Sequence, residues 1–295
     1  MRALPQSDQG AAVQQQTDGI ASVILPARDE AAWIAPCLTA LLAQDTAAGQ
    51  LEVIVVANGC RDATAAIARD HADRFAARGW TLKVLELPDE GGKPGALNAG
   101  DAAAQGAVRI YLDADVRCSP SLIGQLRQAL DTPEPRYATG RLRVPPAQSW
   151  VTRRYAELWL QLPFTAPGTA PGAGIFAVNA AGRGRWGSFP AVISDDTFAR
   201  LQFCPAERHE VTADYLWPMP EGFMRLSRVR RRQDAGVAEI RRAFPSLLGN
   251  EGKPPLRPAD LAGLALRRPV ALAVYAAVLL SNRLRPARAE WERGR

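Results

Sequence analysis

Two aspartates separated by one residue, Asp113 and Asp115, are the side chains of this sequence best suited to chemistry. They follow an apolar run over residues 108–112, which we predict to be a buried strand. Ligands of open α/β sheets bind beyond the carboxyl ends of parallel strands, and two carboxylates this close favour a cation between them. The pair therefore predicts a site for a hard divalent cation, with an ordinary turn after the strand as the alternative.

A Gly-Gly-Lys turn provides a second candidate, because Lys93 opens a predicted helix over residues 93–105. A lysine beside the free N–H groups of a helix N-terminus suits a phosphate or a nucleotide. The GxxxxGK[ST] pattern of a Walker loop is absent from the sequence.

The elements that position these residues alternate between apolar runs and segments of helical period. We predict strands over residues 20–25, 51–56, 82–87 and 108–112, with helices through residue 44 and over 62–77 and 93–105 between them. This alternation is typical of βαβ units and a mainly parallel sheet. A further helix is expected to begin with Ser119 as its cap and Pro120 at its first position.

The second half of the chain is less regular. We predict a strand over residues 137–144, a helix over 150–161, and a Gly/Pro-rich loop over 166–190 around a short strand. Arg-rich helical segments follow. The expected organisation is a tail over 1–19, a catalytic domain over 20–245 (halves 20–117 and 118–245), and a basic, amphipathic extension over 246–295.

Composition excludes several classes of protein. The 295 residues, 47% of them hydrophobic and 22% charged, are ordinary for a globular chain. Four cysteines without CxxC spacing favour neither a zinc site nor a disulfide framework and predict a reducing, cytoplasmic compartment. No GxGxxG follows the first strand, which disfavours a dinucleotide-dependent oxidoreductase. The net charge of +6 favours acidic ligands or an anionic surface, and we expect no nucleic-acid partner.

Five segments in order resemble the motif set of family 2 glycosyltransferases with a GT-A fold. They are VILPARDE (23–30), VIVVANGCRDAT (53–64), GKPGALNAG (92–100), IYLDAD (110–115) and SDDTF (194–198). The resemblance implies a Rossmann-like α/β sandwich and inverting transfer of a sugar from a nucleotide-diphosphate donor to a hydroxyl acceptor. It does not identify the sugar, the base or the acceptor.

The resemblance also implies roles for individual residues. It gives Asp113 and Asp115 to a Mn²⁺ or Mg²⁺ ion, with Asp113 also contacting the donor. The other implied donor-binding residues are Pro26, Ala27, Arg28, Glu30, Asn58, Asp62, Lys93 and Asn98. Ala57 stands where the second motif usually has an acidic residue, so one expected contact is missing.

The general base of such a transfer is implied to lie in the SDDTF segment. Asp196 is our first choice and Asp195 the second, because the local match allows a shift of one residue. The alternative is an acidic helix N-terminus capped by Ser194. The QxxRW element of processive members is not matched, because the segment RRRQDAG at 230–236 lacks the tryptophan.

Two other functions remain open from the sequence. A nucleotidyltransferase acting on sugar phosphates shares the architecture and the metal, and a catalytically degenerate sugar-nucleotide-binding protein accounts for Ala57. The apolar run over residues 270–280 has eleven residues, fewer than the roughly 20 that span a bilayer as a helix. We expect a cytoplasmic protein whose basic C-terminal segment contacts a membrane surface peripherally, at the inner face of the cytoplasmic membrane.

Overall fold

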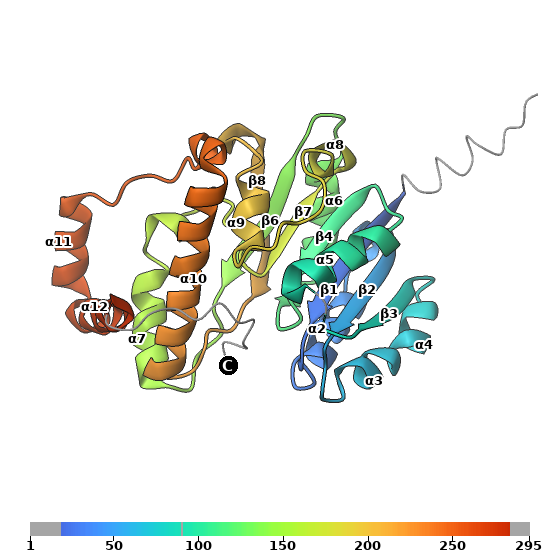
Figure 1. The fold of residues 1–295 in the computed structure, drawn as a ribbon, viewed down its shortest axis with the longest axis horizontal. Coiled ribbons are helices and arrows are strands. Elements are labelled where there is room, and N and C mark those ends of the chain that lie inside the picture. The colour runs from blue at the N-terminus through green and yellow to red at the C-terminus, as the bar shows by residue number, and fades with distance from the viewer. Residues whose placement is uncertain (1–18, 90, 284–295) are drawn as a thin grey trace, which may run out of the picture.

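One eight-stranded sheet organises the chain, in a computed structural model that describes residues 19–89 and 91–283 (Figure 1). The strand order is β3-β2-β1-β4-β7-β6-β8-β5. The strands are β1 (Ile20–Ala27), β2 (Gln50–Asn58), β3 (Thr81–Leu87), β4 (Val108–Leu112), β5 (Arg117–Cys118), β6 (Tyr137–Arg143), β7 (Ile175–Val178) and β8 (Arg208–Leu216). The expected tail lies almost entirely outside the described residues.

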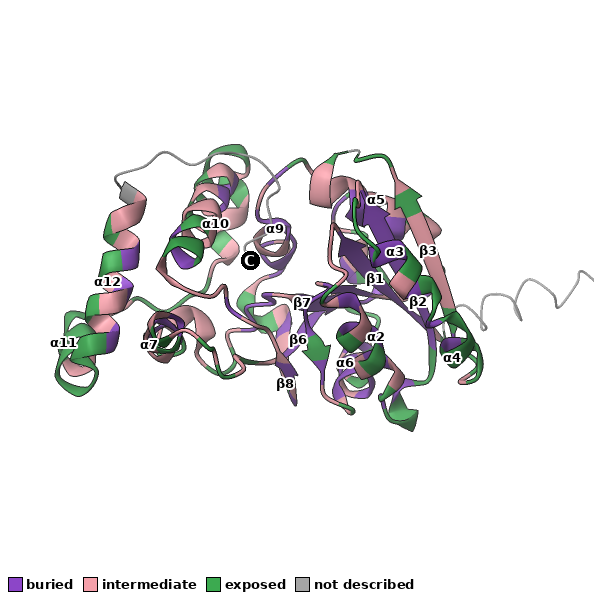
Figure 2. Cartoon of the chain, turned by 90° about the horizontal axis from the view of Figure 1, so that it is seen from below, coloured by how far each residue is buried: buried purple, intermediate pink, exposed green. Residues whose placement is uncertain are grey.

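The first four strands pair in parallel, as predicted from their β-branched runs. Both faces of β1 and β2 are covered, which is why these strands are apolar along their length (Figure 2). One face packs against α2 (Ile34–Leu42), α3 (Thr64–Arg69), α4 (Ala72–Ala76) and α6 (Leu122–Leu130), and the other against α5 (Gly92–Ala103). The predicted α/β fold with a mainly parallel sheet is confirmed.

Two local predictions in this half are wrong. The single helix expected over residues 62–77 is two short helices, because the chain tightens at His71, whose backbone N–H bonds to the carbonyl of Ala68 (3.1 Å). The imidazole of His71 is buried and bonds to the Ile67 carbonyl (2.9 Å). Helix α6 begins at Leu122 and not at Ser119, whose carbonyl accepts the Leu122 N–H in a preceding turn.

An antiparallel strand interrupts the sheet between its two halves. Strand β7 runs antiparallel to both β4 and β6 and places Phe176 opposite Tyr111. Strand β8, which the sequence did not predict as an element, pairs in parallel with β6. The helices of this region are α7 (Trp150–Trp159), α8 (Ala180–Arg183) and α9 (Asp195–Arg200), of which α8 and α9 are short and follow β7. Its 3₁₀ turns are Pro163–Thr165, Pro205–Glu207 and Pro245–Asn250, and a further one, Thr46–Ala48, precedes β2 in the first half of the chain.

Three C-terminal helices, α10 (Phe223–Ala243), α11 (Pro258–Arg267) and α12 (Pro269–Arg283), lie at the end of the molecule opposite β3 (Figure 1). Helix α12 packs on α7 and α10, with Tyr275 stacked on Tyr155 (5.1 Å between centroids) and its hydroxyl accepting from Arg230 (3.1 Å). The expected helical extension is present. Among the described residues no single helix is long and apolar enough to span a bilayer; α11 and α12 pass that test only together, with a 118° bend between them.

The contact of α5 with the sheet depends on a residue without a side chain, Gly100. A Cβ there would lie 2.4 Å from Cγ2 of Ile24 and 3.4 Å from Cγ2 of Val56. We predict that Gly100→Ala lowers the free energy of unfolding by about 1 to 3 kcal/mol, because overpacking exceeds the gain in helix propensity. Urea denaturation measures the change.

The matched control is Gly263→Ala in α11, where nothing lies within 4 Å of the added methyl group. It should be neutral or stabilising by up to about 1 kcal/mol. Equal stability of the two variants would show that α5 does not approach β1 this closely.

Candidate active site

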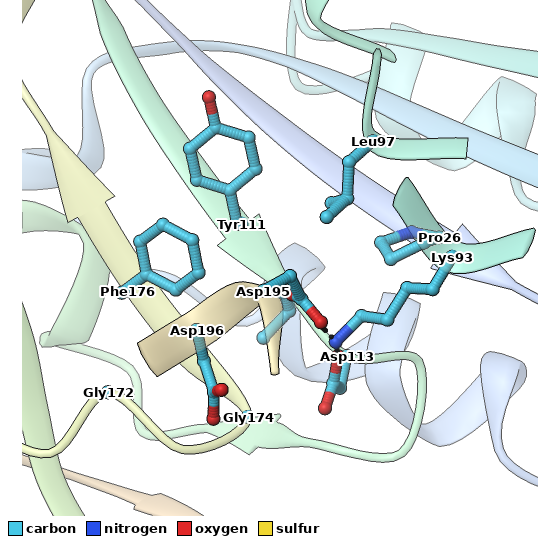
Figure 3. Close-up of a pocket in the computed structure, with 11 residues that line it drawn as sticks. Pro26, Lys93, Leu97, Tyr111, Asp113, Gly172, Gly174, Phe176, Asp195 and Asp196 are labelled. Atoms are coloured by element: carbon cyan, nitrogen blue, oxygen red, sulfur yellow. Dashed lines mark ion pairs between the residues drawn. The ribbon is translucent and has the colours of Figure 1, made fainter. Parts of the chain in front are cut away.

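A pocket lies at the carboxyl ends of β1 and β4, the edge at which ligands of open α/β sheets bind (Figure 3). Its walls come from those strands, from α5, from the first turn of α9, and from the loop that leads into β7. The lining residues are Pro26, Lys93, Leu97, Tyr111, Leu112, Asp113, Gly172, Gly174, Phe176, Asp195 and Asp196. Four of the five motifs, which are far apart in the chain, therefore meet here.

The ammonium of Lys93 lies at the centre of this pocket, between two carboxylates (Figure 3). Its Nζ is 2.9 Å from Oδ1 of Asp113 and 3.1 Å from Oδ2 of Asp195. The Lys93 side chain is 20% exposed and that of Asp195 only 5%. One cation thus joins the end of β4 to the beginning of α9.

Burial and charge act in opposite directions on these groups. Burial alone would lower the pKa of Lys93, but the carboxylates of Asp113, Asp195 and Asp196 outweigh it and raise the pKa above its ordinary value. Burial raises the pKa of Asp195 to about 6, against the lowering effect of Lys93 and with a further rise from the neighbouring carboxylates. Lys93 is therefore firmly charged, whereas Asp195 takes up a proton at a higher pH than an exposed aspartate does.

The position of Lys93 follows from the turn before it. Gly91 and Gly92 have φ of 63° and 60°, a left-handed conformation that favours glycine, and α5 starts there. The side chain of Asn58 donates to the Gly92 carbonyl (2.8 Å) and fixes the turn against the end of β2. Lys93 then occupies the first turn of a twelve-residue helix, where the partial positive charge of the N-terminus adds to its own.

The two aspartates after β4 have different surroundings. Asp113 lines the pocket, and its backbone N–H donates to the Gly174 carbonyl (2.8 Å), which ties the strand end to the loop before β7. Asp115 is 7% exposed, lies in the turn between β4 and β5, and is not among the residues that line the pocket. Their predicted roles as metal ligands stay predictions.

The donor atoms at this strand end fit a hard cation. The acidic side chains there offer carboxylate oxygens, of which Oδ1 of Asp113 is paired with Lys93, and Asp113 is partly exposed toward the pocket. Among residues 19–89 and 91–283, no three His, Cys, Asp or Glu side chains gather as a metal site. The chain would therefore supply one or two carboxylates, as proteins do for Mg²⁺ that takes its other ligands from water and substrate phosphates.

Helix α9 carries both candidates for the general base. Ser194 occupies its N-cap position and both aspartates lie in its first turn, as the alternative interpretation expected, but the Ser194 side chain makes no capping hydrogen bond. Asp195 points to Lys93, and the Asp196 carboxylate lies toward Gly172 and Gly174 (Figure 3), with Oδ1 accepting the Thr197 N–H (2.6 Å). The two carboxylates of this motif thus reach different parts of the pocket.

The loop before β7 closes the pocket on this side. Gly172 and Gly174 have φ of 68° and 81°. A Cβ on Gly172 would lie 1.7 Å from the Tyr137 hydroxyl, and one on Gly174 2.8 Å from Cδ1 of Trp217. Any side chain at these two positions would therefore displace the aromatic residues that pack against the loop.

Several residues with predicted donor contacts lie outside the pocket lining. Arg28 forms a bidentate ion pair with Asp89 (2.7 Å to each oxygen). Asp62 accepts from the backbone N–H groups of Thr64 (3.0 Å) and Ala31 (3.1 Å), one residue before Ala63, which is the N-cap of α3. Further residues outside the lining are Ala27, buried at the end of β1, and Glu30 and Asn58.

Asn98 holds the acceptor-side segment to α5. Its Nδ2 donates to the Phe189 carbonyl (3.0 Å), and its Oδ1 accepts the Phe189 N–H (2.7 Å). Both polar atoms of the amide are therefore bonded to the backbone of Phe189. Asn98 does not line the pocket. Its position favours a structural role over the predicted contact with the donor.

Sequence reasoning missed the aromatic wall of the pocket. Tyr111 and Phe176 stack at 4.7 Å between centroids, and Phe189 contacts Tyr111 edge-on at 5.2 Å. An aromatic residue at the end of a strand that precedes two aspartates was the available signal for Tyr111. Phe176 had none, because its partner strand could not be foreseen.

The fold and the site define an α/β protein with a polar pocket at the carboxyl ends of its parallel strands. The family model for glycosyl transferase family 2 matches residues 22–181, more than half of the chain. The chain belongs to this family, as the five motifs predicted.

Two curated relatives match part of the chain. Glycosyltransferase AglE of Haloferax volcanii is 37% identical over 99 residues, which are 34% of this chain and 31% of the relative. Dolichyl-phosphate beta-glucosyltransferase of Drosophila melanogaster is 36% identical over 100 residues, 32% of this chain and 30% of the relative. The matches thus span about a third of these relatives' length.

Solved structures resemble nearly the whole chain. Mannosyltransferase PcManGT from Pyrobaculum calidifontis, in complex with GDP-Man and Mn²⁺, has a TM-score of 0.57 at 20% identity, covering 92% of this chain and 76% of its own. Residues 1–349 of S. aureus TarS have a TM-score of 0.53 at 17% identity, covering 88% and 72%. Glucosyl-3-phosphoglycerate synthase from Mycobacterium tuberculosis, with Mn²⁺ and UDP-glucose, has 0.50 at 22% identity, covering 80% and 84%. These likenesses establish the GT-A fold.

Removing the central cation tests the electrostatics of the site. We predict that Lys93→Met lowers the free energy of unfolding by about 2 to 3 kcal/mol at about pH 7.5, because it leaves buried Asp195 without its partner. In the wild type the pKa of Asp195 is raised to about 6, so only between its ordinary value and about pH 6 does the folded protein hold a proton that the unfolded chain releases. The difference between variant and wild type should therefore shrink as the pH falls to about 5 and Asp195 is protonated in both.

Thermal or urea denaturation measures the stability of variant and wild type over that pH range. The control is Lys253→Met, which removes the same charge at an exposed lysine. A loss of stability that does not depend on pH would contradict this account of Lys93.

Proposed function

We propose that this protein is a metal-dependent, inverting, non-processive glycosyltransferase that moves a sugar from a nucleotide-diphosphate donor to a hydroxyl acceptor. The observation that carries the proposal is the meeting of Lys93, Asp113 and Asp195 in one pocket at the carboxyl ends of the strands. Membership of glycosyl transferase family 2 supports it. So do the relatives of the same fold that bind GDP-Man or UDP-glucose together with Mn²⁺.

The donor-binding groups follow from the lining of the pocket. Pro26 at the end of β1 faces the nucleotide, and Lys93 binds a diphosphate oxygen. Asp113 and Asp115 would hold Mn²⁺ or Mg²⁺, which supplies positive charge to the departing diphosphate. Asp113 also orients the sugar, because its carboxylate lies between the strand end and the pocket.

The acceptor enters from the side of the loop that contains Gly172 and Gly174. Asp196 takes the proton of its hydroxyl group while the oxygen attacks the anomeric carbon on the face opposite the diphosphate. Asp196 is the better candidate because its carboxylate lies toward this loop, whereas Asp195 is held by the ammonium of Lys93. Asp195 then keeps Lys93 in position at the diphosphate.

The donor is identified by a panel of UDP-, GDP- and TDP-sugars with and without Mn²⁺. A ligand that binds only the folded protein raises its melting temperature. At a ligand concentration a hundredfold above the dissociation constant, the free energy of unfolding increases by about 2.7 kcal/mol. We predict a shift for one class of donor that needs Mn²⁺, and sugar release by hydrolysis of that donor. Release of diphosphate from a nucleoside triphosphate would instead indicate a nucleotidyltransferase.

The base is tested by two variants of equal size and charge, Asp196→Asn and Asp195→Asn. We predict that Asp196→Asn lowers kcat at least about a hundredfold and leaves the donor-induced thermal shift unchanged, because proton removal is lost and binding is not. Asp195→Asn should weaken the thermal shift and retain more of kcat. The reverse pattern would assign the base to Asp195, whose activity would then rise with pH through about 6.

Metal dependence is tested at the buried aspartate of the pair. Asp115→Ala should reduce transfer by at least about a hundredfold and abolish the Mn²⁺ dependence of donor binding, while the far-UV circular dichroism stays that of the folded protein. Full activity in this variant would show that Asp115 does not hold the metal.

We also propose that the protein is located in the cytoplasm.

A further inference from the structure

Helix α12 is apolar on its outer face as well as on its inner one. Ala271, Tyr275 and Val278 are buried against α7 and α10. The residues between them are exposed at a spacing of three and four, which places them in one stripe: Val270, Ala273, Ala277 and Leu280. Val270 and Leu280 are 50% and 58% exposed. A helix at the surface of a water-soluble domain would carry polar residues there.

Helix α11 continues this apolar surface. Leu261 is 42% exposed and Leu266 is 86% exposed, the highest value among the large apolar side chains of the described residues. Ala262 and Ala265 are exposed as well, whereas Leu264 packs against the cluster around α12. Figure 2 shows α11 exposed over most of its surface, at the end of the molecule.

The charged residues around this surface are mostly basic. Residues 257–282 contain four charged side chains, of which Arg257, Arg267 and Arg268 are basic and only Asp260 is acidic. All four are exposed. Arg268 also lies 3.3 Å from Glu157 of α7, so Arg257 and Arg267 contribute most of the available positive charge. Apolar side chains flanked by arginines are the composition of helices that lie in a membrane interface.

We propose that the outer face of α11 and α12 docks on an anionic lipid bilayer. In this arrangement the apolar stripe enters the boundary between headgroups and acyl chains, and Arg257 and Arg267 pair with lipid phosphates. A second copy of the chain fits less well, because a twofold interface brings the same patch onto itself and would place arginine against arginine. The anionic headgroups of a bilayer complement that charge.

The rest of the structure holds this face in place. Stacking of Tyr275 on Tyr155 and its hydrogen bond with Arg230 fix α12 to α7 and α10. The face lies at the opposite end of the molecule from β2 and β3 (Figure 1), so docking leaves the nucleotide side of the pocket in water. Trp159 of α7 contacts Trp217 (6.1 Å between centroids), which packs beside Gly174. Side-chain contacts thus connect the docking face to the acceptor side of the pocket.

Flotation of the full chain with vesicles tests the proposal without any donor. We expect binding to vesicles of phosphatidylcholine that contain about 30% phosphatidylglycerol, and at least about fivefold weaker binding to phosphatidylcholine alone. The double variant Leu266→Gln with Val270→Gln should weaken vesicle binding roughly tenfold, because it removes apolar contacts. The double variant Arg257→Gln with Arg267→Gln should weaken vesicle binding by about fivefold for each arginine, because it removes attraction to anionic lipids. Neither pair of residues belongs to the pocket, so donor binding should not change.

The matched control is Arg74→Gln with Arg117→Gln, two exposed arginines outside the docking face, which removes the same charge and should leave vesicle binding unchanged. Melting temperatures close to that of the wild type confirm that the variants fold. An equal loss of vesicle binding in the control would show that binding depends only on the net charge of the protein, and would overturn the proposal.

Two further outcomes would also overturn it. A dimer in sedimentation experiments without vesicles, made monomeric by the Leu266 and Val270 changes, would show that the face joins two copies of the chain. Vesicle-bound protein that about 0.5 M salt does not release at all would show insertion of the bent pair of helices and not interfacial docking. Failure to bind any vesicle contradicts the docking face but leaves the glycosyltransferase proposal untouched.

Discussion

The ion triad of Lys93, Asp113 and Asp195 is the interaction on which the site depends. It joins the beginning of α5, the end of β4 and the beginning of α9, which are separated by up to about a hundred residues in the chain. Without the ammonium, the three carboxylates of Asp113, Asp195 and Asp196 would repel one another in a partly buried space. The triad adds little net stability in comparison with an apolar contact, but it fixes which groups face the pocket.

The aromatic layer behind the pocket gives this polar cluster a firm support. Tyr111 contacts both Phe176 and Phe189, and Phe189 in turn contacts Phe198 on α9. Helix α9 has only six residues and would not be stable by itself, so its position must come from this packing. The hydrogen bonds of Asn98 with Phe189 fasten the same layer to α5. A polar triad and an apolar layer therefore position the same three elements.

The first half of the fold was predictable because local and global signals agree there. Runs such as residues 51–56 are β-branched and buried on both faces, and Lys93 and Asp113 follow directly from strand ends and helix starts. The convergence of five ordered motifs predicted the family. The break at His71 and the start of α6 at Leu122 were not predictable, because they depend on single backbone hydrogen bonds that no propensity determines.

The second half was predicted only in part, for a different reason: β6, α7 and a short strand within residues 166–190 were expected, but the places of the two strands in the sheet were not. Strand β7 has four residues within a Gly/Pro-rich segment, and only its antiparallel pairing with β4 brings Phe176 to the pocket. Asn98 matched a motif for donor binding, yet its partner lies 91 residues further along the chain. Contacts of this kind are set by tertiary packing, so a motif identifies the residue type and position but not the group that it meets.

The triad also determines how a diphosphate can be received. A lysine ammonium has three N–H donors, of which the carboxylates of Asp113 and Asp195 use two. A third donor is therefore sufficient for one phosphate oxygen while both ion pairs remain. A diphosphate next to Asp113 brings further negative charge to a place that already holds three carboxylates, and one ammonium does not balance it. A divalent cation bound with the donor would supply the missing charge, which gives a physical reason for metal dependence in this arrangement.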